Sequence, residues 1–238
     1  MKVEIKRVKI FTDGANLDEM VALAKRPEIS GLTTNPTLMQ KSGVKDYREF
    51  CRKVLSEIKS KPISFEVIAD DFAGMRKQAQ ELASWGENVY VKIPVMNTQG
   101  EASYGLIREL AGMRIKQNVT AVFDLEQVRS VAEALKGGPA SVISVFAGRI
   151  ADTGRDPVPH MRQALAICRA ADPSIELLWA SPREVLNVVQ ADEIGCDIIT
   201  VTPDISKKLA FLNKDLREFS RETVEMFKND AEKAGFQL

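Results

Sequence analysis

The amino-acid sequence predicts a closed (β/α)8 barrel, the TIM-barrel architecture, with an additional C-terminal helix. Eight short apolar segments alternate with segments of helical periodicity along the 238 residues, as in parallel barrels. The apolar segments are rich in Val and Ile on both faces, as expected of parallel strands that are covered on both sides. An open doubly wound sheet would need a glycine-rich phosphate turn after its first strand, and Asp13-Gly14-Ala15-Asn16 is not one.

The first half of the chain is expected to contain four strands and three main helices. Asn16 can cap the first helix, because Glu19 follows three residues later, and Pro27 ends it. Asn35-Pro36 is expected to break the second strand. The expected strands are 8–12, 29–34, 63–68 and 88–94, and the expected helices are 17–26, 46–60 and 71–85.

The second half repeats the same unit. Asp124 is expected to cap a helix that ends before Gly137, and Pro203 stands where the last barrel helix begins. The expected strands lie within 115–123 and at 141–146, 176–180 and 197–201, and the other expected helices are 103–113, 157–171 and 183–191.

Residues 213–236 are left over after the eighth unit and are expected to form a helical extension. Leu216, Phe219, Met226 and Phe227 lie on one side of that helix. Such an apolar stripe has to be buried, either on its own barrel or on a neighbouring subunit. Since no linker or low-complexity segment divides the chain, we expect residues 1–238 to form a single domain.

Composition excludes several classes of function. Lysine plus arginine equals aspartate plus glutamate at 33 each, so bulk charge favours neither nucleic acid nor a membrane surface. The three cysteines are far apart and lack metal-ligand spacing, so we expect no metal, no cofactor and a cytoplasmic location. The N-terminal run MKVEIKRVKIF is no signal peptide, and no apolar run approaches the ~20 residues that span a bilayer.

Lys92 is the most informative single residue. It lies near the end of the apolar strand 88–94, where Pro94 stops the sheet ladder. Burying an ammonium without a partner is costly, whereas an uncharged amine is a nucleophile for carbonyl carbons. Lys92 therefore either reaches solvent, pairs with a carboxylate, or forms a Schiff base.

Polar residues gather at the ends of the expected strands, where the active sites of such barrels lie. Carbinolamine formation needs proton transfer, for which Glu66 and Thr120, through a water, are suited, and Asp13 is the other carboxylate. Arg149 and Arg183 with Ser181 would clamp a phosphomonoester, unless both arginines pair with nearby acidic residues. The strand-end residues are Asp13, Asn35, Glu66, Lys92, Asn118, Thr120, Ser144 and Ser181. The possible acidic partners of the arginines are Asp152, Asp156 and Glu184.

Four motifs closely resemble the transaldolase family, including its small fructose-6-phosphate aldolase branch. They are Thr33-Thr34-Asn35-Pro36, Val91-Lys92-Ile93-Pro94, Asn118-Val119-Thr120-Ala121 and Phe146-Ala147-Gly148-Arg149-Ile150-Ala151-Asp152. The resemblance implies that Lys92 forms the Schiff base, that Asp13 is the base for the substrate C4 hydroxyl, and that Glu66 and Thr120 hold the catalytic water. It further implies substrate contacts for Asn35, Asn118 and Ser144, and a phosphate site at Arg149, Ser181 and Arg183.

The resemblance also bears on which reaction is catalysed. The aldolase branch usually has glutamine where this chain has Glu66 and tyrosine where it has Phe146. Both positions favour a transaldolase that moves a dihydroxyacetone unit between sugar phosphates, as in the pentose phosphate pathway. The alternatives are an aldolase that releases dihydroxyacetone and a sugar-phosphate-binding barrel without turnover. Small family members are often homo-oligomers. Two residues depart from the usual family pattern: Pro182 follows Ser181 where an aromatic residue is usual, and Gly14 follows Asp13 where threonine is usual. These departures bear on which sugar phosphate is used.

Overall fold

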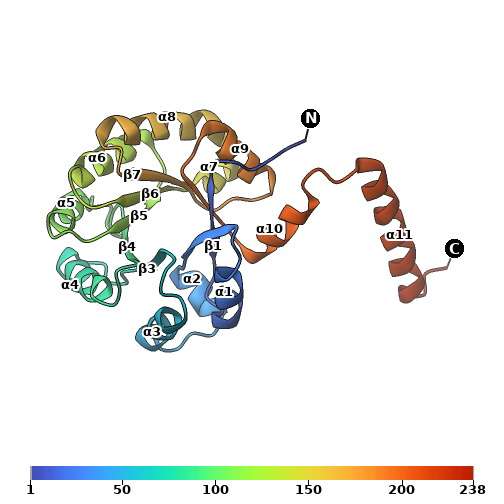
Figure 1. Cartoon of the computed structure of the whole chain (residues 1–238), viewed down its shortest axis with the longest axis horizontal. Coiled ribbons are helices and arrows are strands. Elements are labelled where there is room, and N and C mark those ends of the chain that lie inside the picture. The colour runs from blue at the N-terminus through green and yellow to red at the C-terminus, as the bar shows by residue number, and fades with distance from the viewer. Residues whose placement is uncertain (1, 238) are drawn as a thin grey trace.

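The chain forms a closed barrel of eight parallel strands surrounded by helices. The computed structural model describes residues 2–237. Each strand pairs in parallel with the next, and β1 pairs with β8 to close the ring (Figure 1). The strands are β1 (Lys9–Asp13), β2 (Ile29–Thr33), β3 (Ile63–Glu66), β4 (Val89–Pro94), β5 (Gln117–Val122), β6 (Ser141–Val145), β7 (Ile175–Trp179) and β8 (Ile198–Val201). The predicted fold is thus confirmed.

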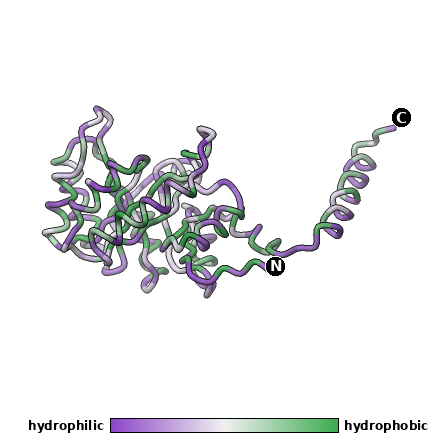
Figure 2. Tube along the Cα trace, turned by 90° about the horizontal axis from the view of Figure 1, so that it is seen from above, coloured by the Kyte–Doolittle hydropathy of each residue, from purple (hydrophilic) through white to green (hydrophobic). Residues whose placement is uncertain are grey.

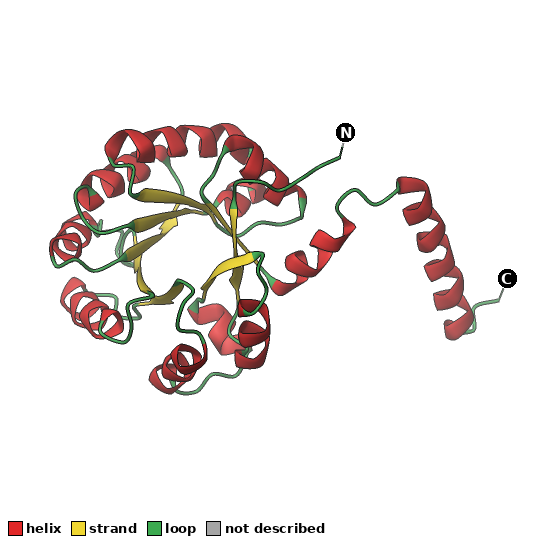
Figure 3. Cartoon of the chain, in the orientation of Figure 1, coloured by secondary structure: helices red, strands yellow, loops and turns green. Residues whose placement is uncertain are grey.

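Helices surround the barrel, and the last helix of the chain extends beyond it (Figure 3). They are α1 (Leu17–Ala24), α2 (Pro36–Lys41), α3 (Tyr47–Glu57), α4 (Phe72–Ala83), α5 (Tyr104–Gly112), α6 (Leu125–Leu135), α7 (Ala147–Asp152), α8 (Pro157–Ala171), α9 (Leu186–Ile194), α10 (Pro203–Lys208), the 3-10 turn η1 (Leu209–Phe211) and α11 (Leu216–Ala234). Within residues 2–237, no helix is both long and apolar enough to cross a membrane.

Three helices differ from the expectation. The break expected at Asn35-Pro36 is instead the start of α2, because the Asn35 side chain accepts a hydrogen bond from the Leu38 amide and Pro36 occupies the first turn. α7 follows β6 directly and was not predicted. α9 begins three residues later than expected, because the Arg183 and Glu184 amides donate to the Asn187 side chain in a turn that precedes it.

The interior of the barrel is filled by apolar side chains below a polar mouth. Phe11, Val142, Leu178, Ala180 and Ile198 form this inner cluster, which is separate from the larger core between strands and helices. Gly31 makes room for Phe11, since a Cβ at Gly31 would lie 2.5 Å from the Phe11 ring. Residues nearer the carboxyl ends of the same strands therefore sit above a solid floor and face a cavity.

α11 stands away from the barrel. Figures 1 and 2 agree in showing it beyond α10, joined by an extended segment. No residue of α11 is buried, and the side chains of Leu216 and Phe227 are 80% and 63% exposed. The possibility that its apolar stripe packs on its own barrel is therefore wrong. Within residues 2–237 the helix is tied locally near its start, where the Phe219 ring lies 5.6 Å from that of Phe211 and Lys214 pairs with Glu222.

Candidate active site

One cavity of about 540 Å³ opens at the carboxyl ends of the strands. All eleven residues predicted for the site line it. They are Asp13, Asn35, Glu66, Lys92, Asn118, Thr120, Ser144, Phe146, Arg149, Ser181 and Arg183. The charged side chains of the lining are thus Lys92 and Glu66 on the adjacent strands β4 and β3, Asp13 on β1, and the cations Lys41, Arg149 and Arg183 from the loops and helices that follow the strands.

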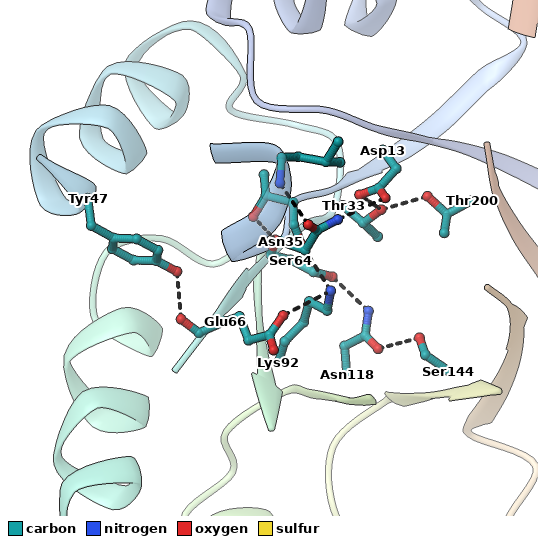
Figure 4. Close-up of polar contacts among 12 residues, drawn as sticks. Asp13, Thr33, Asn35, Tyr47, Ser64, Glu66, Lys92, Asn118, Ser144 and Thr200 are labelled. Atoms are coloured by element: carbon teal, nitrogen blue, oxygen red, sulfur yellow. Dashed lines mark hydrogen bonds and ion pairs between the residues drawn. The ribbon is translucent and has the colours of Figure 1, made fainter. Parts of the chain in front are cut away.

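Lys92 lies on the inner wall and is buried. Strand register places Glu66, Lys92 and Asn118 side by side on β3, β4 and β5. The Lys92 side chain does not reach solvent: the residue is 6% exposed, and its Nζ donates to the Thr34 carbonyl at 2.9 Å. Nζ also lies 3.2 Å from Glu66 Oε2 (Figure 4). Of the alternatives left open for the resting enzyme, pairing with a carboxylate is the one observed.

Glu66 is held at the end of β3 by a side chain from outside the barrel. The Tyr47 hydroxyl on α3 donates to the Glu66 main-chain carbonyl at 2.6 Å (Figure 4). Burial raises the pKa of this phenol, so Tyr47 remains a neutral donor. The contact fixes the strand end from which the Glu66 carboxylate reaches Lys92.

Asp13 lies at the end of β1 on the other side of the mouth. Its Oδ1 accepts from Thr33 Oγ1 at 2.9 Å and its Oδ2 from Asn35 Nδ2 at 3.1 Å. Burial raises the pKa of the Asp13 carboxyl, because the loss of hydration outweighs the opposing effects of Lys92 and of these two hydrogen bonds. A carboxyl whose pKa is raised in this way is suited to accept a proton.

A third group of polar side chains crosses the floor of the cavity. Asn118 Nδ2 donates to Ser64 Oγ at 3.0 Å, and Ser144 Oγ donates to Asn118 Oδ1 at 2.6 Å. Thr120 is buried on the same strand as Asn118. Its neighbour Ala121 has a φ of 58°, where the pairing of β5 with β6 shifts register. This irregularity adjoins the cavity, as strained backbone at functional sites often does.

The two arginines have different surroundings. Arg183 Nε donates to Asp152 Oδ1 at 3.0 Å, and a second contact makes the ion pair bidentate. Arg149 forms no ion pair within residues 2–237, and its guanidinium lies 5.2 Å from the centre of the Phe146 ring. Pairing with acidic residues, the alternative to a phosphate clamp, therefore holds for Arg183 and not for Arg149.

Ser181 is fixed by a close approach of two backbones. It has a φ of 60°, and a Cβ on Gly148 would lie 1.6 Å from the Ser181 carbonyl oxygen. Only glycine fits at position 148. The first turn of α7 and the end of β7 are therefore in direct contact, which brings Ser181 close to Arg149.

Several polar residues around the cavity were not predicted as site residues. Thr33 and Thr200 line the cavity. They point into the barrel, as does every second residue of their strands, so side-chain alternation is a signal that could have found them. Tyr47 has no such signal, because its acceptor is a main-chain carbonyl. Lys41 also lines the cavity. Within residues 2–237, no three His, Cys, Asp or Glu side chains come together as metal ligands would.

Comparison with known proteins identifies the family. The profile of the family described as Transaldolase/Fructose-6-phosphate aldolase matches residues 10–238. The chain belongs to this family. The match extends beyond the barrel and includes α11, so the extended helix is part of the family pattern.

Curated relatives agree with the family assignment. A probable transaldolase of Thermoanaerobacter sp. is 33% identical over 231 residues, covering 97% of this chain and all of the relative. One from Methanococcus maripaludis is 35% identical over 85% of this chain and 89% of its own length. A third, from Carboxydothermus hydrogenoformans, is 38% identical over 82% of this chain and 86% of its own length. This chain is thus a transaldolase-family enzyme.

Solved structures of distant proteins support the barrel fold alone. A mandelate racemase/muconate lactonizing enzyme-like protein from Rubrobacter xylanophilus aligns with a TM-score of 0.58 at 11% identity, covering 87% of this chain and 55% of that protein. A putative phosphonomutase from Burkholderia cenocepacia aligns at 0.56 with 13% identity, covering 87% and 93%. Neither likeness bears on the reaction of the transaldolase-family chain.

Proposed function

We propose that this family member is a transaldolase, which transfers a dihydroxyacetone unit from a ketose phosphate to an aldose phosphate through a Schiff base on Lys92. The observation that carries the proposal is the buried Lys92 amine 3.2 Å from Glu66, in a cavity that Asp13 and two arginines also line. A nucleophilic amine, two proton-transfer groups and an anion site are the parts that this chemistry requires.

Imine formation begins at the Lys92–Glu66 pair. The ammonium first gives a proton to Glu66, and the free amine then attacks the ketone carbon of the donor sugar. Loss of water from the carbinolamine needs a proton delivered to its oxygen. Glu66 supplies it through a water that Thr120 holds, while Asn118 and Ser144 contact the carbinolamine and the substrate hydroxyls.

Carbon–carbon cleavage uses Asp13 as base. Asp13 removes the proton of the C4 hydroxyl, the C3–C4 bond breaks, and its electron pair moves toward the iminium nitrogen to give an enamine. The aldose phosphate leaves. An acceptor aldose phosphate then enters, the enamine carbon attacks its aldehyde, and Asp13 returns the proton to the new hydroxyl. Water then adds to the resulting iminium carbon, and cleavage of the C–N bond releases the product ketose phosphate and the Lys92 amine. Asn35, which donates to Asp13, is placed to contact the same region of the substrate.

The phosphate of donor and acceptor is proposed to bind at Arg149, Ser181 and Arg183. Arg149 is free of ion pairs among the described residues, and its guanidinium lies over Phe146 on the cavity wall. The Arg183–Asp152 pair is exposed, with side chains 47% and 51% accessible. Exposed pairs of this kind contribute little, so Arg183 is available to share its guanidinium with a phosphate.

The main alternative within the family is an aldolase that releases dihydroxyacetone. Phe146 places no hydroxyl on the cavity wall to position a water against the enamine, and Glu66 takes the place of the glutamine of that branch; both favour transfer. The test is turnover of fructose 6-phosphate with and without an acceptor aldose phosphate. Transfer predicts acceptor-dependent product, whereas steady release of dihydroxyacetone without acceptor contradicts it.

The other alternative is a barrel that binds a sugar phosphate without turnover. The Lys92–Glu66 contact favours catalysis over binding alone. Glu66 already neutralises the charge of Lys92, so Lys92 would contribute little as a cation that binds the sugar phosphate. A protein of this kind would bind the ketose phosphate reversibly and form no covalent bond to Lys92.

We further propose that α11 packs on a second copy of this chain in the cytoplasm. The helix buries none of its apolar side chains on its own barrel, and the family profile includes it. An exposed apolar stripe needs a partner to cover it. Because the family profile includes this helix, the partner should be one that is always available, and a second copy of the same chain meets that condition.

A further inference from the structure

A pair of threonine hydroxyls connects the eighth strand to Asp13. Thr33 Oγ1 donates to Asp13 Oδ1 at 2.9 Å and lies 2.6 Å from Thr200 Oγ1 (Figure 4). Both side chains are nearly inaccessible, at 2% for Thr33 and 7% for Thr200. Thr200 belongs to the inner face of β8, two residues beyond Ile198 of the inner cluster. The contact therefore lies inside the barrel, beside the proposed base.

The direction of these hydrogen bonds follows from the number of protons. A hydroxyl has one hydrogen and two acceptor lone pairs, and an ionised carboxylate only accepts. The Thr33 hydrogen therefore points to Asp13, and none is left for Thr200. Thr200 must donate to Thr33, which is the sole partner of its hydroxyl among residues 2–237. The three groups form a chain directed toward the carboxylate.

We propose that Thr200 is a positioning residue that acts through Thr33 to keep Asp13 in its base form. Donation by Thr200 fixes the Thr33 hydroxyl in the orientation that points its hydrogen at Oδ1. It also polarises that hydroxyl, since hydrogen bonds in a chain strengthen one another. The inference rests on the proposed role of Asp13 as the base for the C4 hydroxyl.

Asp13 needs such support because its charge is opposed. Burial and the Glu66 carboxylate raise the pKa of Asp13, whereas Lys92 and the hydrogen bonds from Thr33 and Asn35 lower it. Removing a hydrogen bond to the charged form raises the pKa further. The other charged groups of the cavity are Lys41, Arg149 and Arg183. None of these three cations forms a hydrogen bond or ion pair with Asp13 or Thr200 among residues 2–237, so a substitution at Thr200 leaves their contacts unchanged.

The test is a titration of the Asp13 carboxyl, followed by its ¹³C chemical shift in the full-length protein and assigned with Asp13→Asn. Thr200→Val keeps the side-chain volume and removes the hydroxyl. We expect it to raise the pKa of Asp13 by about half a unit and Thr33→Val by about one unit. Because Thr200 acts through Thr33, the double variant is expected to titrate like Thr33→Val alone.

Two control variants separate this chain from a general effect of losing a hydroxyl. Thr200→Ser keeps the donor and is expected to restore the wild-type titration. The buried Thr12 hydroxyl has no hydrogen-bond partner among residues 2–237. Thr12 lies next to Asp13 on the opposite face of β1, so Thr12→Val should leave the titration unchanged. If Thr200→Val unfolds in a thermal melt, Thr200→Ala carries the same prediction.

An unchanged pKa in Thr200→Val would overturn the inference, as would a double variant whose shift is the sum of the two single shifts. The titration needs no substrate, so it stays interpretable if Lys92 forms no adduct. In that case the proposed function fails and the hydrogen-bond chain is judged separately. With active enzyme, the acidic limb of kcat should move to higher pH in Thr200→Val.

Discussion

At the scale of single residues, the two carboxylates of the site have different partners. Glu66 contacts the Lys92 amine at 3.2 Å, whereas Asp13 is bound by Thr33 and Asn35 on the other side of the mouth. In the proposed mechanism, Glu66 therefore serves proton transfers at the nitrogen and Asp13 serves those at a substrate hydroxyl. The roles can be separated by experiment.

Asp13→Asn removes the base and keeps the side-chain shape. We expect kcat to fall by about a thousandfold, while imine formation at Lys92 continues. Mass spectrometry after borohydride reduction should then find Lys92 carrying the intact ketose phosphate, because its C3–C4 bond is no longer cleaved. A three-carbon adduct in this variant would show that Asp13 is not the base for cleavage.

The pH dependence of activity should report the ionisation of Asp13. Burial raises the pKa of its carboxyl, and the base form is the ionised one. Activity is therefore expected to be present above this raised pKa and to be lost as the pH falls through it. The measurement is kcat/KM against pH, and an acidic limb no higher than that of an ordinary aspartate would contradict the account.

Sequence reasoning placed all eleven predicted residues, charged and neutral, at the cavity, but it missed Lys41, Thr200 and Tyr47. A lysine and two carboxylates at the ends of apolar strands are conspicuous because burying charge is costly. Thr200 carries no charge and Tyr47 acts on a main-chain carbonyl, so neither has a comparable signature. The sequence also did not indicate which of Arg149 and Arg183 pairs with Asp152, because this depends on which guanidinium lies beside Asp152 in the folded chain.

At the scale of elements, apolar runs bounded by Gly, Pro or Asp located all eight strands, because buried parallel strands are apolar on both faces. The short helices α2 and α7 were missed. The Asn35-Pro36 cap of α2 was interpreted as a strand break, and α7 lacks a capping side chain, because Phe146 at its N-cap makes no such hydrogen bond. Both carry residues that line the cavity, including Lys41 and Arg149.

Gly148→Ala tests the contact between α7 and the end of β7. A Cβ at this position would overlap the Ser181 carbonyl oxygen, so the two backbones must separate, which would displace the proposed phosphate site. We expect kcat/KM for phosphorylated substrates to fall about a hundredfold. Gly105→Ala is the matched control, because a Cβ there meets nothing within 4 Å. Equal effects of the two substitutions would contradict this role of Gly148.

At the scale of the whole molecule, the barrel is complete by itself and α11 is not. The amphipathic pattern of residues 213–236 could be recognised in the sequence. The sequence did not indicate whether this helix packs on its own chain, because an apolar stripe implies a partner without identifying it. The structure excludes packing of α11 on its own barrel, because the whole helix lies outside the barrel (Figure 2).

Phe227→Glu tests the proposed partner of α11. The Phe227 side chain is 63% exposed and lies on the apolar stripe, so a charge there should oppose packing on a second copy. We expect light scattering to show an oligomer for the wild-type chain and a smaller species for the variant. Asn229→Glu adds the same charge off the stripe and should preserve the oligomer. A wild-type chain that is monomeric at micromolar concentration would rule the interface out.

Mass spectrometry of the borohydride-reduced enzyme tests the central claim most directly. The protein is incubated with fructose 6-phosphate without acceptor, reduced, digested and sequenced, with Lys92→Met as the matched control. We expect a reduced adduct on Lys92, with the mass of a dihydroxyacetone unit or of the intact sugar phosphate, and none in Lys92→Met. A wild-type enzyme that turns over the sugar with no adduct on Lys92, or with the adduct on another lysine, would contradict the account.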